Sequence, residues 1–233
     1  GLVNFIPPMN RLNTYRLTTR YNPATQLLSE QAYQVDVSYK FNKSWSTNLN
    51  YSNIQKLDGT QLYDEKLIEV TYKQKRKWQL TGGLQLQEYN QDIYESKPGV
   101  PMLNTVTPYL DFLYKISRKK SIRFESQYMI TDQDFGSWAY GLLEVGLAPH
   151  WLFELSGMYN VSPNVNKNEI PNNPETGEKR KILYPTLGAV YINKGNRFSL
   201  RYVKQVQGVV CNGGICRLEP AFSGVRFNMT SNF

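Results

Sequence analysis

The amino-acid sequence predicts an all-β protein, an antiparallel up-and-down transmembrane β-barrel with about twelve strands. Three observations support this prediction: apolar and polar residues alternate with a period of two, short and long connections alternate along the chain, and tryptophans follow the short connections. The mean hydropathy of −0.52 does not oppose it, because a barrel strand shows lipid an apolar side chain only at every second residue. Composition alone would suit a soluble all-β sandwich or barrel equally well.

The strands follow from the alternation. It is clearest from Tyr33 to Phe41, where apolar residues alternate with polar ones, and such a pattern gives a strand one apolar and one polar face. The predicted strands reach roughly nine or more residues, the length that a tilted membrane-spanning strand needs. The same pattern recurs at 45–52, 68–72, 78–87, 106–116, 122–130 and 151–159, and a closing strand covers 224–233.

The connections between these strands are of two kinds, which alternate along the chain. Outer-membrane barrels have short periplasmic turns and longer outside loops. We therefore expect a protein of the bacterial cell outer membrane with its C-terminus on the periplasmic side. The short connections are 42–44, 74–77, 117–120, 148–150 and 193–196, and the long ones are 22–30, 53–64, 90–103, 160–179 and 207–223, with a shorter one at 131–136.

Tryptophans mark the predicted membrane boundaries. Trp45, Trp78 and Trp151 each come directly after a short connection, where a strand would enter the bilayer. Amphipathic rings favour the headgroup level and form girdles there. We assign Trp138, which follows a loop of the opposite side, to the outer girdle, and Phe233 ends the closing strand with an aromatic ring. The alternative is that the four tryptophans are the core of a soluble sheet.

The short connections are basic. They hold eight lysines and arginines and no acidic residue, so their summed charge equals the formal net charge of +8. A ring of bases at one membrane surface would meet anionic lipid headgroups, whereas a nucleic-acid site would need one continuous basic face. The alternative is that these charges only keep the turns soluble. The residues are Lys43, Lys75, Arg76, Lys77, Arg118, Lys119, Lys120 and Lys194.

Charged residues also occupy the predicted lumen face, in equal numbers of each sign. Six acids and six bases argue for an interior of paired charges and amides rather than an ion filter of one sign. The acids are Asp36, Glu69, Asp111, Glu125, Glu144 and Glu154, and the bases are Lys40, Lys73, Lys115, Arg123, Arg201 and Arg226.

Two cysteines, Cys211 and Cys216, flank a Gly-Gly turn. Two close thiols in an exported protein predict a small disulfide, and the alternative is a pair of free thiols. No metal site is expected, because two cysteines without a neighbouring histidine cannot supply the four ligands of a structural zinc ion.

Catalysis has little support in the sequence. The only histidine, His150, lies in a short connection on the inferred periplasmic side, away from the outer loops where a barrel hydrolase would need a base beside its nucleophile. Asp132 and Asp134 could hold a cation weakly, although acidic loops are usually just solvated. We expect neither an enzyme nor a cofactor.

The two ends of the chain are more specific. The segments 4–8, 14–17, 24–26 and 209–233 resemble an uncharacterised family of Bacteroidota outer-membrane β-barrel proteins. This resemblance implies that 1–11 is a lead-in inside a longer barrel and that 12–233 is a transmembrane β-barrel, either the C-terminal part of it or the whole. Under that reading, the closing strand would pair with a strand before Gly1.

The expected function is therefore that of a scaffold or accessory subunit of an outer-membrane complex for protein assembly, secretion or uptake. Its expected partners are the lipid bilayer, the barrel-assembly machinery during insertion, and other outer-membrane proteins or lipoproteins. A passive channel or transporter for small solutes is the alternative, and an outer-membrane hydrolase is a more distant one.

Overall fold

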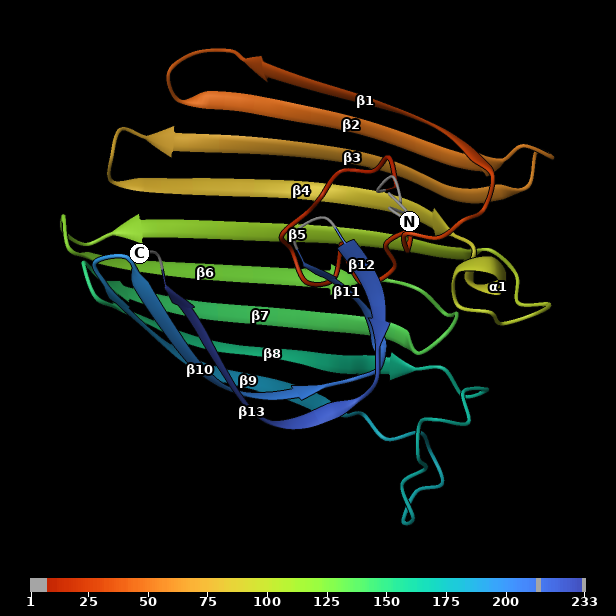
Figure 1. The fold of residues 1–233 in the computed structure, drawn as a ribbon. Coiled ribbons are helices and arrows are strands. Elements are labelled where there is room, and N and C mark those ends of the chain that lie inside the picture. Colours follow the sequence, from red (N-terminus) through yellow and green to blue (C-terminus); the bar gives the residue numbers. More distant parts are fainter. Residues whose placement is uncertain (1–7, 213–214, 232–233) are drawn as a thin grey trace.

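The structure is a computed structural model that describes residues 8–212 and 215–231, with the backbone alone for 209–212 and 215–218. Eleven of its strands form one antiparallel sheet (Figure 1). Each strand pairs with the next one along the chain, except that β10 pairs with β13 across an intervening hairpin. The strands of the sheet are β1 (Glu30–Lys40), β2 (Trp45–Lys56), β3 (Gln61–Gln74), β4 (Trp78–Tyr89), β5 (Leu103–Lys115), β6 (Lys120–Met129), β7 (Gly136–Leu147), β8 (Trp151–Pro163), β9 (Leu183–Asn193), β10 (Asn196–Gln205) and β13 (Phe222–Ser231).

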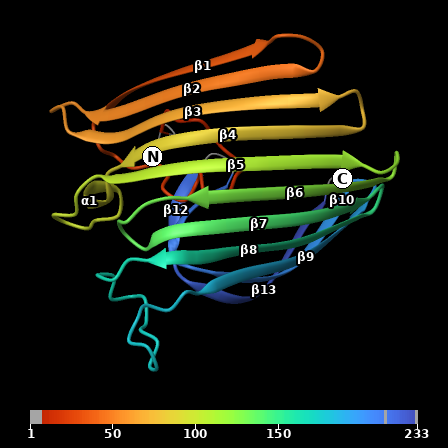
Figure 2. The same cartoon turned by 180° about the vertical axis from the view of Figure 1, so that it is seen from behind.

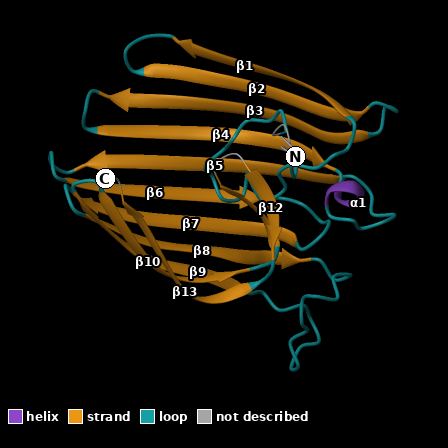
Figure 3. Cartoon of the chain, in the orientation of Figure 1, coloured by secondary structure: helices purple, strands orange, loops and turns teal. Residues whose placement is uncertain are grey.

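The all-β, antiparallel, up-and-down architecture is thus confirmed, with eleven strands in the sheet where about twelve were expected. The sheet curls strongly from β8 to β13, while β1 and β13 form its two edges (Figures 1 and 3). The intervening hairpin consists of β11 (Gly208–Asn212) and β12 (Ile215–Glu219), and one short helix, α1 (Gln91–Tyr94), follows β4. No helix in the described residues is long and apolar enough to cross a membrane.

The five predicted short connections all lie at one end of the sheet. Figure 2 shows this end with the sheet seen from behind. At the opposite end, one predicted long loop is wrong. The segment 53–64 belongs largely to β2 and β3, and only 57–60 connects them. Ile54, Leu62 and Tyr63 are buried and extend the strands, and Gly59 permits the tight turn with its φ of 88°.

The two faces of the sheet differ as the alternation predicts. The convex face carries exposed apolar side chains in register across neighbouring strands: Leu49 opposes Ile68, Ile68 opposes Leu84, and Phe124 opposes Leu143. The concave face is polar or buried. This arrangement leaves a broad apolar surface on the outside, whereas large exposed apolar patches are uncommon on soluble monomers.

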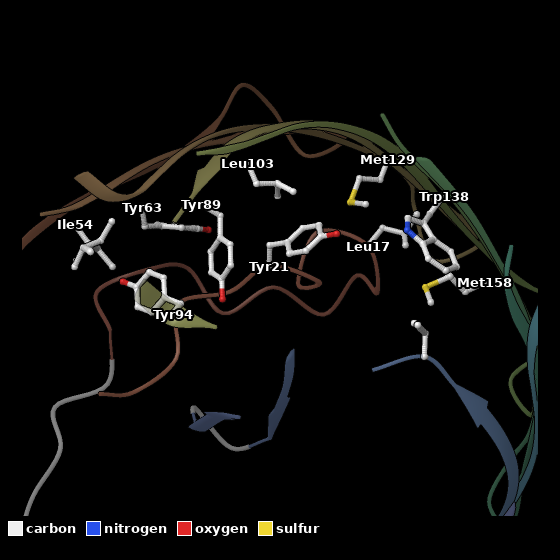
Figure 4. Packing of buried hydrophobic residues seen from close by; sticks show 12 residues of the cluster. Leu17, Tyr21, Ile54, Tyr63, Tyr89, Tyr94, Leu103, Met129, Trp138 and Met158 are labelled. Atoms are coloured by element: carbon white, nitrogen blue, oxygen red, sulfur yellow. The ribbon is translucent and has the colours of Figure 1, made fainter. Parts of the chain in front are cut away.

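The first strand begins at Glu30, so residues 12–21 do not form a strand of the sheet. They form turns on the concave side, in front of the central strands in Figure 1. We call residues 8–29 the inner segment. It packs with α1 and the loop-side half of the sheet around a buried apolar cluster (Figure 4). This cluster contains Leu17, Tyr21, Ile54, Leu62, Tyr63, Tyr89, Tyr94, Leu103, Met129, Trp138, Met158 and Val206.

Candidate functional site on the concave face

Buried glutamines on the concave face bind the backbone of the inner segment. Gln127 accepts a hydrogen bond from the Leu17 amide at 2.6 Å, and Gln85 donates to the Thr18 carbonyl oxygen at 3.0 Å. Gln87 donates to the Tyr21 carbonyl oxygen at 2.9 Å. A buried chain outside a sheet must satisfy its backbone groups elsewhere, and these amides do so. The sequence reasoning missed these glutamines, although their alternation with apolar residues is visible.

The start of the inner segment contacts the charges of the central strands. Arg11 bonds to Asn48 and lies 3.6 Å from the Glu69 carboxylate. The Tyr15 ring packs 4.2 Å from that of Tyr109, measured between centroids, and Tyr109 donates to Glu69 at 2.9 Å. Glu69 therefore links the sheet to the inner segment.

Further charges of the concave face pair with one another. Arg123 binds Asp111 at 3.0 Å and Glu125 at 2.5 Å, and Arg201 binds Glu154 at 3.0 Å. Asp36 accepts from Asn48 and Asn50, Arg226 contacts Glu219, and Glu144 lies opposite Arg123 in the register. Lys40, Lys73 and Lys115 are exposed near the short turns.

The carboxylate of Asp134 connects its own loop to two other loops and to the inner segment through hydrogen bonds and salt bridges. Asp134 lies between β6 and β7, and its carboxylate accepts from Tyr21 at 2.8 Å, from Lys97 at 3.2 Å and from Lys167 at 2.6 Å. Lys97 belongs to the loop after α1, and Lys167 to the loop after β8. The weak cation site considered at Asp132 and Asp134 is therefore wrong for Asp134, because lysines occupy its carboxylate. We call these four residues, Tyr21, Lys97, Asp134 and Lys167, the loop clamp.

The loop clamp should make stability depend on pH. Burial by itself raises the pKa of Asp134, but Lys97, Lys167 and Arg20 lower it from 3.8 to about 2. A lowered carboxyl pKa stabilises the folded state above pH 4, and this contribution is lost as the pH falls through 2. When the pH is lowered from 5 to 2, the unfolding free energy of the unmodified protein should fall by about 2 kcal/mol more than that of Asp134→Asn, which lacks this carboxyl group. Equal losses in denaturant titrations at the two pH values would contradict this.

Aromatic rings cover the short-turn end of the convex face. Trp45 packs on Tyr72 at 4.7 Å between ring centroids, and Tyr72 packs on Trp78 at 5.0 Å. Farther round the sheet, Trp151 packs on Tyr191 at 4.8 Å. These rings come from five strands and lie at one level, as a girdle would require. The predicted Phe233 member lies outside the described residues.

The assignment of Trp138 to the outer girdle is wrong. Its side chain is 1% exposed and lies in the apolar cluster on the concave side. The guanidinium of Arg20 stands 4.7 Å from the centroid of its ring. Leu143, on the same strand, faces outward. Because successive side chains of a strand alternate between the two faces, the even-numbered Trp138 faces inward.

A basic groove opens at the short-turn end, with a volume of about 960 Å³. Its basic lining residues are Arg76, Lys77, Lys115, Arg118, Lys119 and Lys120. No aspartate or glutamate lines it, and within the described chain none of the six bases forms a salt bridge. The eight predicted turn bases are all exposed.

The remaining candidates are the histidine and the two cysteines. His150 is exposed in its turn, where Nδ1 lies 2.8 Å from the carbonyl oxygen of Ile192. Cys211 and Cys216 oppose each other in the register of the β11–β12 hairpin. Their side chains lie outside the described part, so the disulfide stays a prediction. Among the described residues, no group of acidic, histidine or cysteine side chains is arranged to hold a metal ion.

The fold and the site define a class of protein: an antiparallel up-and-down β-sheet with an apolar convex face and a polar concave face occupied by its own N-terminal segment. The chain belongs to a family of unknown function (DUF6029), which matches residues 1–233. No curated protein matches it.

Proposed function

We propose that this chain forms a bacterial outer-membrane β-barrel, or a large part of one, and acts as a scaffold or accessory subunit of an outer-membrane complex. The observation that supports this most is the contrast between the two faces. The convex face is apolar across the sheet, and the loop-side half of the concave face is filled by the inner segment. A filled interior suits a protein that holds partners rather than one that conducts solutes.

Membrane insertion is supported by three further features. The eleven strands have 10 to 14 residues each, enough to cross the hydrocarbon core when tilted. The aromatic level and the basic turns lie at the same end, where anionic lipid headgroups would meet them. That end would be periplasmic, and β13 runs toward it.

Closure of the barrel belongs to this proposal. Open sheet edges do not occur in the hydrocarbon region, because their backbone groups would lack hydrogen-bond partners. In the bilayer, β1 and β13 therefore pair with each other or with further strands. Insertion would need the barrel-assembly machinery, and the partners held by the scaffold would be outer-membrane proteins or lipoproteins engaged in protein assembly, secretion or uptake.

A passive channel is the second candidate, favoured by the basic groove at the short-turn end. Such a channel would select anions, because the groove is lined by bases without acids. An outer-membrane hydrolase has less support, since His150 hydrogen-bonds within the short-turn end.

Planar-bilayer recording separates the scaffold from the channel. We expect the purified protein to show no steady conductance, because the inner segment blocks the interior. Deleting residues 10–21 should open a measurable one, and the variant Lys194→Gln, which changes only an exposed turn, should stay closed. A large steady conductance from the unmodified protein would favour the channel and overturn the scaffold proposal.

A further inference from the structure

A partly open cavity beside the inner segment is lined by an arginine that forms no salt bridge within the described residues. The cavity has a volume of about 170 Å³ and lies between Arg16 and the curled part of the sheet. Its walls come from the inner segment and from four strands, β7 to β10. The lining residues are Arg16, Tyr140, Glu154, Ser156, Met158, Tyr184, Thr186, Val203, Lys204 and Gln205.

Among the described residues, the guanidinium of Arg16 is attracted electrostatically by Tyr140 and Glu219 but forms no direct bond to either. Arg16 is partly buried, and within the described chain it forms no salt bridge and donates no hydrogen bond. Arginine stays charged in proteins, and a charge taken from water without a partner is costly. Burial lowers the pKa of Arg16, and Arg20 and Arg226 lower it further, while Tyr140 and Glu219 oppose this in part.

The acid on the cavity wall is already engaged. Glu154 is bound by Arg201 at 3.0 Å, and Gln205 is engaged with Glu219 at 3.2 Å. Lys204 places its ammonium 5.6 Å from the ring centroid of Tyr184. Two cations, Arg16 and Lys204, thus line the cavity without a salt bridge to a carboxylate of the described residues.

The rest of the wall can donate hydrogen bonds. Tyr140, Ser156, Tyr184 and Thr186 line the cavity with hydroxyl-bearing side chains, and Tyr140 and Ser156 hydrogen-bond to each other. Hydroxyls orient toward an acceptor, and an arginine binds an oxyanion through two parallel N–H groups. The volume corresponds to roughly five or six waters at about 30 Å³ each, which leaves room for an ion of the size of phosphate.

We propose that this cavity is a binding site for a small oxyanion, with Arg16 as its principal ligand and Lys204 and the hydroxyls completing it. The site is independent of the basic groove, which lies at the short-turn end, and it does not depend on the scaffold proposal. The bound anion would neutralise Arg16 and so fix the inner segment against β7 to β10.

Inorganic phosphate is the probe that tests this site. Phosphate should raise the Tm of the purified full chain at constant ionic strength, whereas chloride should not, because ligand binding to the folded state stabilises it. Isothermal titration should show at least tenfold weaker phosphate binding by Arg16→Gln. The control Arg118→Gln, in the basic groove, should bind phosphate like the unmodified protein.

Other outcomes would overturn the proposal. The unmodified chain would bind no phosphate, or Arg16→Gln would bind phosphate as tightly as the unmodified chain. Loss of phosphate binding in Arg118→Gln alone would place the phosphate in the basic groove. If Arg16→Gln does not fold, Lys204→Gln provides the second test: its phosphate affinity should fall at least threefold, and an unchanged affinity would contradict the site.

Discussion

Replacing Phe124 by arginine should lower the unfolding free energy in a bilayer by about 2–4 kcal/mol. Phe124 lies in the middle of β6 on the convex face, and its side chain is 47% exposed. If this face contacts lipid, the arginine enters the hydrocarbon midplane. If the face contacts water, the same substitution should change the free energy by no more than about 0.5 kcal/mol.

The measurement is guanidinium unfolding of the protein folded into phospholipid vesicles. Leu147→Arg provides the matched control, because Leu147 ends β7 at the short-turn level and also faces outward. Its cost should be only about 0–1 kcal/mol, as expected for an interfacial position. Equal small costs at both positions would contradict a membrane-spanning sheet.

Replacing Trp138 by alanine should cost about 3–5 kcal/mol of unfolding free energy, the usual range for a fully buried tryptophan. The ring fills the space between Leu17, Met129 and Met158 and receives the guanidinium of Arg20. Its removal leaves a cavity and also uncovers a buried charge. Denaturant unfolding measures the loss.

Trp151→Ala is the comparison for this prediction. Trp151 is 46% exposed at the short-turn end and packs on Tyr191 and Phe153. We expect a clearly smaller loss than for Trp138→Ala, because its removal leaves no enclosed cavity. A larger loss at Trp151 would mean that Trp138 does not support the core.

Period-two alternation was enough to predict most strands of the sheet and their two faces, although it did not mark β7, β9 and β10. The residues predicted for the lumen lie on the concave side because the side-chain period of a strand is two and the register of antiparallel neighbours preserves it. The same rule could have placed Trp138 correctly, since Leu143 on that strand faces outward. The position of Trp138 beside a loop predicted its face less well than the alternation did.

The inner segment could not be predicted in the same way. Tyr15, Leu17 and Tyr21 occur at odd positions, as in a strand with one apolar face. Their actual partners lie far away in the chain, such as Gln127, which is 110 residues from Leu17. Such contacts depend on the folded sheet and have no local signal. The loop clamp is equally non-local, since Asp134 binds residues from three other segments.

The apolar convex face is the central claim, and fluorescence quenching in a bilayer tests it most directly. Single cysteines at 68, 69, 84, 85, 124 and 125 would carry a fluorescent label in vesicles of brominated lipid. We expect strong quenching at Ile68, Leu84 and Phe124, and little at their neighbours Glu69, Gln85 and Glu125, which face the concave side. Weak and equal quenching at all six positions would contradict a sheet whose convex face lies in lipid.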